Sequence, residues 1–458
     1  MEKNQFRLAD VILSVICVVF VAEAAAPVAS IGNSQYFWWG FMILAFLLPY
    51  GLIAAELGTA YAGDGGLYDW IHAAYPQGKW AARASWYYWI NFPLWMASLA
   101  VMCPELLRDI TGRQMGTIAS LAVQLLFIWI VTLIACYPVC DSIVILNVSA
   151  VIKILLALLV GGLGVWYISR YGFVNDMSAR TFLPSFDLNS LSYISVIIFN
   201  FLGFEVVCTY ANNMSDPKKQ IPQSIVTGGI VIAAIYLFSA FGIGAAVDVR
   251  EISVDSGLID AVSLILGGSG GVLVGVVALL FLVTLFGNMI SWSMGVNSTA
   301  ALAADHNDMP RVFAKRWAKN DMPVGAAVTS GVVASCVCVL GVLIEMASPD
   351  SSLFWSFFAL NLVMLLLSYL PVFPAFLKLR REDAKTPRPF RVPGSDTALK
   401  WIAYVPMVLI VISIIFTAVP LSFDAETLAS FLPITIGSIL SVAIGEVLIA
   451  LRGKNACS

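Results

Sequence analysis

The chain has 458 residues, of which 60% are hydrophobic and 12% charged, and its formal net charge is −3. Charged residues make up about a quarter of soluble domains, so this composition excludes an ordinary soluble protein. The near-neutral charge, without a basic stripe, also gives no indication of a nucleic-acid partner. We expect a protein that is embedded in a membrane and surrounded by lipid.

Twelve apolar runs follow one another along the chain. They are long enough to cross a hydrocarbon core of about 30 Å as helices, whereas the strands of a membrane barrel alternate over about ten residues. The sequence therefore predicts an all-α, multi-pass protein with twelve transmembrane helices. We expect the first run to stay in the membrane rather than to be cleaved as a signal peptide. The runs lie at about residues 8–31, 37–61, 84–104, 116–136, 143–168, 191–211, 225–247, 272–303, 324–346, 353–378, 400–420 and 428–451.

The distribution of Lys and Arg predicts the orientation. Nineteen of the 25 basic residues fall in segments on the same side of the membrane as the N-terminus, and one, Lys153, lies inside a run. The remaining five lie in the opposite loops and are Arg108, Arg113, Arg170, Arg180 and Arg250. Cytoplasmic loops carry the excess of basic residues. Both termini are therefore expected in the cytoplasm, with the protein in the cell (inner or plasma) membrane.

Three ionisable side chains lie inside the runs, namely Glu23 in the first, Lys153 in the fifth and Glu205 in the sixth. A charge at the middle of a membrane helix costs about 2.5–3.5 kcal/mol on insertion scales, so each is a candidate functional residue. A hydrogen bond to a neighbouring helix is the simpler alternative for a residue such as Glu23 taken alone. The corresponding mid-run positions of all three favour a functional site.

Runs one and six also contain helix-breaking residues near their middles. In "VFVAEAAAPVASIGNSQ", Pro27 follows Glu23, and in "VIIFNFLGFEVVCTYANN", Gly203 precedes Glu205. The two runs are five spans apart and enter the membrane from opposite sides. Interrupted helices at matching positions of two inverted halves indicate the substrate site of a secondary transporter. The residues predicted to bind substrate at these breaks are Glu23, Ala24, Ala26, Gly203 and Glu205.

Four strings, in order along the chain, resemble signatures of the amino acid–polyamine–organocation superfamily. They are "AAELGTAYAGDGGLYDWI" at 54–71, "FLGFEVVCTYANNMSDPKKQIPQSI" at 201–225, "ALAADHNDMPRVFAKRWAKNDMPVGAA" at 301–327 and "LKLRREDAKTPRPFRVPG" at 377–394. Most of their loop residues are fold markers rather than site residues. Within the superfamily, the chain resembles the bacterial amino acid and polyamine antiporters.

The resemblance implies a fold and a domain organisation. We expect a five-plus-five inverted-repeat (LeuT-like) core with interrupted helices 1 and 6, which works by alternating access around a central site. The transport core would span residues 1–378, with helices 1–5 at about 8–168 and helices 6–10 at about 191–378. Residues 379–458 would hold a cytoplasmic loop, helices 11 and 12 and the C-terminal tail.

Three residues match functional positions of the superfamily. Glu205 matches a sixth-span glutamate that lines the cavity of arginine–agmatine and putrescine–ornithine exchangers and is tied to their response to pH. Lys153 matches a fifth-span lysine that replaces a coupling cation in sodium-independent members, and a desolvated ammonium suits proton coupling. Trp292 matches an eighth-span aromatic whose face attracts an ammonium or guanidinium group by up to about 2 kcal/mol; simple packing is its alternative role. The predicted coupling residues are thus Lys153 and Glu205.

The first run departs from the family pattern in a way that bears on the substrate. Members that carry amino acids usually have a glycine-rich break there, whose bare amides hold the substrate carboxylate. This chain has "AEAAAPVAS" instead, with no glycine and with the charge of Glu23. A carboxylate-bearing substrate would be repelled and an amine attracted. The expected substrate is a small amine, a polyamine or a cationic amino acid, moved by exchange or with protons; the alternative is a general permease or antiporter for neutral or acidic amino acids.

Four further polar or aromatic residues lie in runs that the resemblance places around the cavity. These additional candidate substrate-binding residues are Asn91, Trp95, Asn288 and Asn361. The aromatic stretch "SWYYWINFPLW" that contains Asn91 and Trp95 suits an amine cage, although such stretches in membrane helices are more often packing.

The sequence disfavours other classes of membrane protein. An enzyme would want several His or Asp residues at one membrane face, but the chain has only His72 and His306, so no catalytic residue, metal site or cofactor is predicted. A channel would favour rings of polar residues, and a sensor usually carries an appended domain. No single-span glycoprotein partner is expected. We expect a monomer or homodimer whose ligands are a small amine or amino acid and protons.

Overall fold

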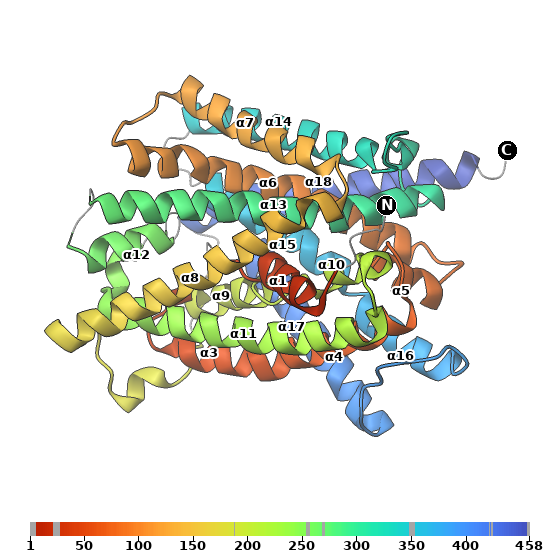
Figure 1. Cartoon of the computed structure of the whole chain (residues 1–458), viewed down its shortest axis with the longest axis horizontal. Coiled ribbons are helices and arrows are strands. Elements are labelled where there is room, and N and C mark those ends of the chain that lie inside the picture. Colours follow the sequence, from red (N-terminus) through yellow and green to blue (C-terminus); the bar gives the residue numbers. More distant parts are fainter. Residues whose placement is uncertain are drawn as a thin grey trace.

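The structure is a computed structural model, which describes residues 6–21, 28–186, 188–252, 257–267, 271–347, 353–420, 422 and 425–455. Within these ranges the chain is helical and forms no strand beyond one isolated bridge between Phe6 and Met214. The long helices lie side by side and run mostly along the long axis of the molecule (Figure 1). The helices α5 and α16 and the last turns of α18 gather at one end of this bundle, which we call the α5 end.

The long helices correspond to the predicted apolar runs, and shorter helices such as α5 and α12 lie between these runs. Their bounds are α1 Leu8–Val19, α3 Ser34–Met42, η2 Ile43–Leu47, α4 Leu48–Ala60, α5 Leu67–Ala74, α6 Trp80–Thr111, α7 Thr117–Ala135, α8 Val139–Tyr171, η3 Ala179–Phe182, α9 Leu188–Phe199, α10 Phe204–Cys208, η4 Ala211–Asn213, α11 Pro217–Ala246, η5 Val249–Glu251, α12 Gly257–Ile265, α13 Val272–Asp305, η6 Arg311–Ala314, α14 Val324–Ala347, α15 Leu353–Tyr369, α16 Val372–Glu382, α17 Asp396–Ala418 and α18 Ala425–Asn455.

Ten helices in the described ranges are long and apolar enough to cross a membrane. Two shorter apolar helical segments, Leu8–Val19 and Tyr193–Cys208, correspond to the runs in which breaks were predicted. The all-α, multi-pass fold is thereby confirmed, and ten long helices with two interrupted ones are compatible with twelve spans. The predicted run at 353–378 is divided into α15 and α16 by a turn at Leu370 and Pro371. Pro371 has no backbone N–H to continue the helix.

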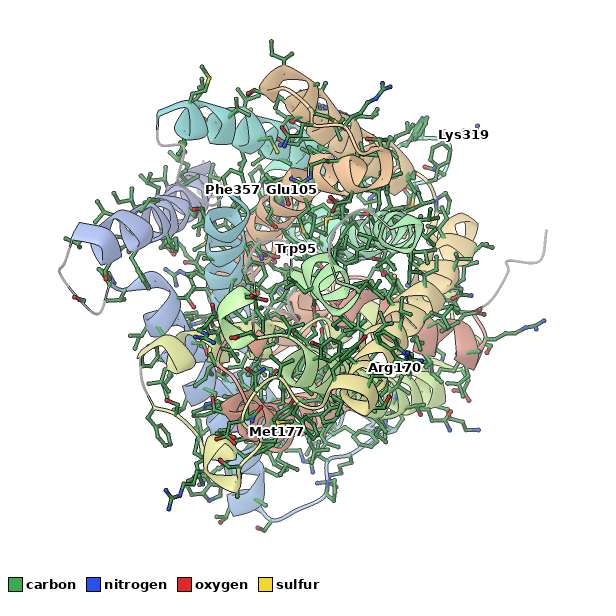
Figure 2. All side chains as sticks on the ribbon, turned by 90° about the vertical axis from the view of Figure 1, so that its left-hand side faces the viewer. Trp95, Glu105, Arg170, Met177, Lys319 and Phe357 are labelled. Atoms are coloured by element: carbon green, nitrogen blue, oxygen red, sulfur yellow. The ribbon has the colours of Figure 1, made fainter. Side chains whose placement is uncertain are left out.

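Helix α1 lies in the interior of the bundle. It packs against α8, α11, α10 and α13, while α6 packs against α13 and α15. Seen along the bundle, Trp95 of α6 lies near the middle and Lys319 lies at the rim (Figure 2). The hydrophobic core is continuous through these helices. Residues near the middle of α1, α6 and α13 are therefore shielded from both lipid and water.

Helix α1 ends just before the predicted break of the first run, and the predicted break of the sixth run lies between α9 and α10. Helix α1 ends at Val19, and Phe20 already has extended backbone angles (φ −75°, ψ 110°). Glu23, Ala24 and Ala26, which follow in the predicted break, lie outside the described residues. In the sixth run, α9 ends at Phe199 and α10 begins after Gly203. The predicted interruption of this run is confirmed.

A buried ion cluster fastens α4 to α16 at the α5 end. The carboxylate of Glu56, with 1% of its side chain exposed, pairs with Arg380 and lies 3.1 Å from Nε of Arg388. Its Oε2 also accepts a 2.7 Å hydrogen bond from the backbone N–H of Val392. Two guanidinium groups and one main-chain donor thus share a single carboxylate, which fixes the segment after α16 against the transmembrane helices.

Removing this carboxylate tests its role. Glu56→Ala leaves Arg380 and Arg388 largely buried beside no counter-charge, so we expect the free energy of unfolding to fall by about 3–5 kcal/mol. Thermal unfolding in detergent, followed by tryptophan fluorescence, measures the change. Glu382→Ala is the matched control, because it removes an exposed carboxylate from α16 that pairs with the exposed Arg381; it should be nearly neutral. Equal effects of the two substitutions would contradict a special role for Glu56.

Candidate substrate site

Glu205 lies at the interruption between α9 and α10 and is fully buried. Both of its carboxylate oxygens accept hydrogen bonds from tyrosines of other helices. Tyr88 of α6 donates to Oε1 over 2.6 Å, and Tyr50 of α4 donates to Oε2. Hydroxyl donors on both oxygens offset part of the cost of removing a carboxylate from water. One acidic side chain therefore connects three helices at the centre of the bundle.

A third tyrosine completes this cluster. The ring of Tyr369, on α15, meets the rings of Tyr50 and Tyr88 edge-on, at centroid distances of 5.5 Å and 6.4 Å. Its hydroxyl is buried close to the carboxylate of Glu205. Edge-to-face contacts of this kind are a favoured aromatic arrangement. We call Glu205 and these three residues the tyrosine–carboxylate cluster.

Gly203 allows the helix to break beside this cluster. Its φ of +114° is strained for any residue with a Cβ. Space is also limiting, because a Cβ there would lie 2.7 Å from Cγ1 of Val18 and 3.2 Å from Cζ2 of Trp292. The absence of a side chain lets the break of the sixth span approach both α1 and α13.

The end of α1 exposes carbonyl groups that need partners. Lys153 of α8 donates to the carbonyls of Cys17 and Phe20 over 2.8 Å and 2.5 Å. Asn288 of α13 donates to Cys17 and Val18 over 3.2 Å and 3.3 Å. The indole of Trp292 donates to Val18 over 3.2 Å. These three side chains satisfy the carbonyl end of α1, which carries a partial negative charge.

The two interruptions share one hydroxyl, that of Tyr236 on α11. It accepts a 2.8 Å hydrogen bond from the backbone N–H of Val21 and donates to Oδ1 of Asn200 over 3.1 Å. Its ring also stacks on Trp39 at 4.8 Å. The segment after α1 and the segment after α9 are therefore held to the same side chain.

Trp95 and Asn288, two of the predicted substrate-binding residues, are in contact. The indole N–H of Trp95 donates to Oδ1 of Asn288 over 3.1 Å. The ring of Trp95 meets Phe199 and Phe358 edge-on at 5.2 Å and 5.6 Å. This places an aromatic cluster next to the end of α9 and links it through Asn288 to the end of α1.

Asn91 and Asn361 are buried but make mainly local contacts. The amide of Asn91 donates to the carbonyl of Tyr88, and that of Asn361 donates to Phe358 over 3.3 Å. Oδ1 of Asn361 has no hydrogen-bond partner in the described part of the chain. No hydrogen bond between described residues joins Asn91 to Glu205 or Trp292. Their assignment to the site remains a prediction.

Sequence reasoning missed the four tyrosines of this region, Tyr50, Tyr88, Tyr236 and Tyr369. A signal was present, because each hydroxyl lies inside an apolar run and a buried hydroxyl needs a partner. A neutral hydroxyl costs less to bury than a charge, so its presence within an apolar run does not by itself indicate a site. The pairing of Tyr236 with a main-chain N–H leaves no pattern in the sequence.

Two interrupted helices around a buried carboxylate define the class, a secondary transporter with an inverted-repeat core. A solved structure, that of MhsT in complex with L-phenylalanine, shares the fold with a TM-score of 0.61, covering 91% of this chain and 99% of that one at 17% identity. The chain belongs to the amino acid permease family, whose model matches residues 5–444. The resemblance to the amino acid–polyamine–organocation superfamily is thereby confirmed.

Similar proteins within the family are named for different substrates. A protein of Lactococcus lactis named as a probable agmatine/putrescine antiporter, AguD, is 59% identical over 95% of this chain and 92% of its own length. The polyamine transporter RMV1 of Arabidopsis thaliana is 24% identical over 82% of this chain and 73% of its own. A glutamate/gamma-aminobutyrate antiporter of Lactococcus lactis is 21% identical, over 82% and 76%.

The break at Gly203 can be tested directly. Gly203→Ala adds a Cβ to a residue with positive φ and presses it against Val18, so we expect a loss of at least about 2 kcal/mol of stability. Thermal unfolding in detergent provides the measurement. Gly162→Ala on α8 is the control, because a Cβ there meets no atom within 4 Å; alanine within a helix should be neutral or stabilising. An unchanged melting temperature for Gly203→Ala would show that the break tolerates a side chain.

Proposed function

We propose that this protein exchanges small amines across the cell membrane, with agmatine and putrescine as the first candidates. The observation that carries the proposal is the fully buried carboxylate of Glu205 at the break of the sixth span. The identity of 59% to a probable agmatine/putrescine antiporter supports it over nearly the whole length of both chains. Both molecules carry a cationic group at each end, so they suit a site with separated negative groups.

Glu205 and Trp292 would recognise one end of the substrate. An ammonium group near Glu205 gains a charge-assisted hydrogen bond, and the face of a tryptophan attracts a desolvated cation. Trp292 lies beside the break, because its ring approaches Gly203. Oδ1 of Asn361, which is buried without a partner in the described part of the chain, would serve as a further acceptor.

Glu23 would provide the second negative group. Its position in the sequence, four residues after the end of α1, places it in the predicted break of the first span. Two carboxylates in the two breaks would hold both ends of a diamine or guanidino-amine, with Ala24 and Ala26 lining the same segment. Two buried carboxylates without a cationic substrate would be costly, which favours exchange over an empty return of the carrier.

Substrate binding would act on the helix contacts through the tyrosine–carboxylate cluster. An ammonium that reaches Glu205 competes with hydroxyl groups from α4 and α6 for the same two oxygens. The bonds that connect these helices to α10 would then differ between the loaded and the empty site. A ligand that changes such contacts shifts the balance between two conformations, which is the requirement for alternating access.

Lys153 would act in coupling. Its ammonium group joins α8 to two carbonyls at the end of α1, so its proton helps to determine whether these helices stay together. Loss of that proton would remove the charge and one of the donors. We propose that the charge state of Lys153 biases the position of α1.

The orientation and the domain limits belong to the same proposal. Nineteen of the 25 basic residues share a side with the N-terminus, which supports a cytoplasmic location for the α5 end and both termini. Residues 1–378 would form the transport core, to which α17 and α18 are added.

Labelling of Lys218→Cys with a membrane-impermeant maleimide tests the orientation. We expect no reaction in intact cells, and a reaction there would contradict the proposed orientation.

Counterflow in proteoliposomes tests the substrate. We expect vesicles loaded with agmatine or putrescine to take up radiolabelled putrescine, and vesicles loaded with glutamate or neutral amino acids to show little uptake. Glu205→Gln and Glu23→Gln each remove one negative charge with little change in shape, so each should lower amine exchange at least tenfold. Purified protein of each variant with an unchanged melting temperature is required for the comparison.

The alternative function, a permease or antiporter for neutral or acidic amino acids, gives the opposite outcome. The glutamate/gamma-aminobutyrate relative shows that the family includes proteins named for such substrates. Robust exchange of these amino acids that is unchanged in Glu23→Gln would reject the amine proposal and leave Glu23 a structural residue.

Lys153 has a test of its own. Lys153→Gln keeps a hydrogen-bond donor to the end of α1 but removes the titrating charge. We expect exchange to fall at least tenfold and the remaining rate to depend less on pH than in the wild type. Lys319→Gln, an exposed basic residue at the rim of the bundle, is the control and should leave the rate unchanged. A Lys153→Gln variant with the wild-type rate and pH profile would exclude a coupling role.

A further inference from the structure

The only two histidines of the chain meet at the α5 end, outside the tyrosine–carboxylate cluster. His72 belongs to α5 and His306 follows α13, 234 positions later in the sequence. Their rings stack almost in parallel, with centroids 5.2 Å apart and an interplanar angle of 8°. The ring of Tyr68 stacks against both, at 5.3 Å from His72 and 5.7 Å from His306.

One hydroxyl and one carboxylate hold this stack together. The hydroxyl of Tyr68 donates to Oδ2 of Asp308 over 2.9 Å. Nδ1 of His306 and Nδ1 of His72 lie 3.1 Å and 3.3 Å from the same hydroxyl. Nδ1 of His72 is also 3.8 Å from Oδ2 of Asp308. We call Tyr68, His72, His306 and Asp308 the histidine cluster.

The charged groups around the cluster are mostly paired with one another. Asp305, next to His306, pairs with Arg316, and Asp64, before α5, accepts a hydrogen bond from Asn212. Lys378 pairs with Glu382 on α16, which packs against α5. Arg83, at the start of α6, pairs with Glu446. Asp69 of α5 faces the cluster and is largely buried. Its burial raises its pKa to about 6, so it titrates in the same range as histidine.

The cluster is close to the substrate site through α5. Gly66, at the start of α5, approaches the tyrosine–carboxylate cluster so closely that a Cβ there would lie 3.3 Å from the carbonyl oxygen of Glu205. The carbonyl of Gly65 accepts a 3.1 Å hydrogen bond from Thr299 of α13. The start of α5 therefore contacts both α10 and α13, and the histidine cluster further along α5 joins this helix to the segment that follows α13.

Protonation changes the forces within the cluster in two stages. A proton on His72 places a positive charge 3.8 Å from Oδ2 of Asp308, and these two charges attract. A second proton places two like charges in stacked rings 5.2 Å apart, and these repel. Neutral or singly protonated rings hold α5 against the end of α13, whereas doubly protonated rings push them apart.

We propose that the histidine cluster is a pH-sensitive latch, which keeps the α5 end closed near neutral pH and opens it when that side becomes acidic. The proposal rests on alternating access and on the proposed orientation, by which the α5 end faces the cytoplasm. It does not depend on which amine or amino acid is carried. Acidification of the cytoplasmic face would thereby expose the substrate site to that side.

A distance measurement tests the latch without any substrate. Spin labels at Ala73→Cys on α5 and Arg311→Cys on η6, both exposed, would report the separation across the cluster by double electron–electron resonance in liposomes. The eight native cysteines are replaced for this purpose. We expect the population with the longer distance to increase at least threefold between pH 7.5 and pH 5.5.

The double variant His72→Phe/His306→Phe keeps aromatic rings for stacking but cannot gain protons, so its distance distribution should be the same at both pH values. His72→Gln/His306→Gln, which also cannot be charged, replaces it if the Phe variant does not fold. A wild type without a pH response, or an acid response that persists in the uncharged variant, would overturn the proposal.

Asp69→Asn separates the histidines from the other group that titrates in this range. The histidine-dependent opening should remain in this variant, because the stacked rings are unchanged. Loss of the acid response in Asp69→Asn, together with its retention in the histidine variants, would identify Asp69 as the sensor and reject the latch.

Exchange rates measured with the lumenal pH fixed and the pH on the cytoplasmic face varied should show the same pattern for any substrate that the protein carries. A pH-dependent change in the label distance in a protein that exchanges no amine would therefore contradict the proposed substrate and leave the latch proposal standing.

Discussion

The structure depends on one constraint, that backbone polar groups inside a membrane must find partners within the protein. A transporter breaks helices in the middle of the bilayer and so creates free carbonyl and N–H groups where no water is at hand. Here Lys153, Asn288 and Trp292 satisfy the carbonyls at the end of α1, and Tyr236 takes up the N–H of Val21. The residues that solve this backbone problem are also those that surround the candidate site.

A buried charge likewise needs partners within the protein. Glu205 is buried at the second break, and hydroxyl groups from α4 and α6 hold both of its oxygens. Each of these contacts crosses from one helix to another, so the site and the packing of the bundle are not separate features. At the α5 end, Arg388 pairs with the carboxylate of Glu56, and the hydroxyl of Tyr68 donates to the carboxylate of Asp308, so these contacts also join separate segments of the chain.

Much of this could be predicted from the sequence. Run length and hydropathy gave the membrane helices, and Gly203 beside Glu205 marked the break in the sixth span, because both features are local. Glu205 and Lys153 stand out as ionisable residues within apolar runs, whereas Asn288 and Trp292 follow from the family resemblance. The tyrosines do not stand out, because a hydroxyl in an apolar run is common and Glu205 lies 155 residues from Tyr50 and 117 from Tyr88. The stacking of His72 on His306 likewise depends on how α5 folds back on α13, which no local pattern encodes.

The way in which α1 is held has an evolutionary consequence. Lys153, Asn288, Trp292 and Tyr236 all bind its main chain, and none of these hydrogen bonds involves an α1 side chain. Substitutions that preserve the packing of this segment therefore leave these hydrogen bonds in place. A family built in this way can acquire a new cargo by changing a few side chains at the break of the first span, since the scaffold recognises the peptide backbone and is indifferent to the residues that it carries.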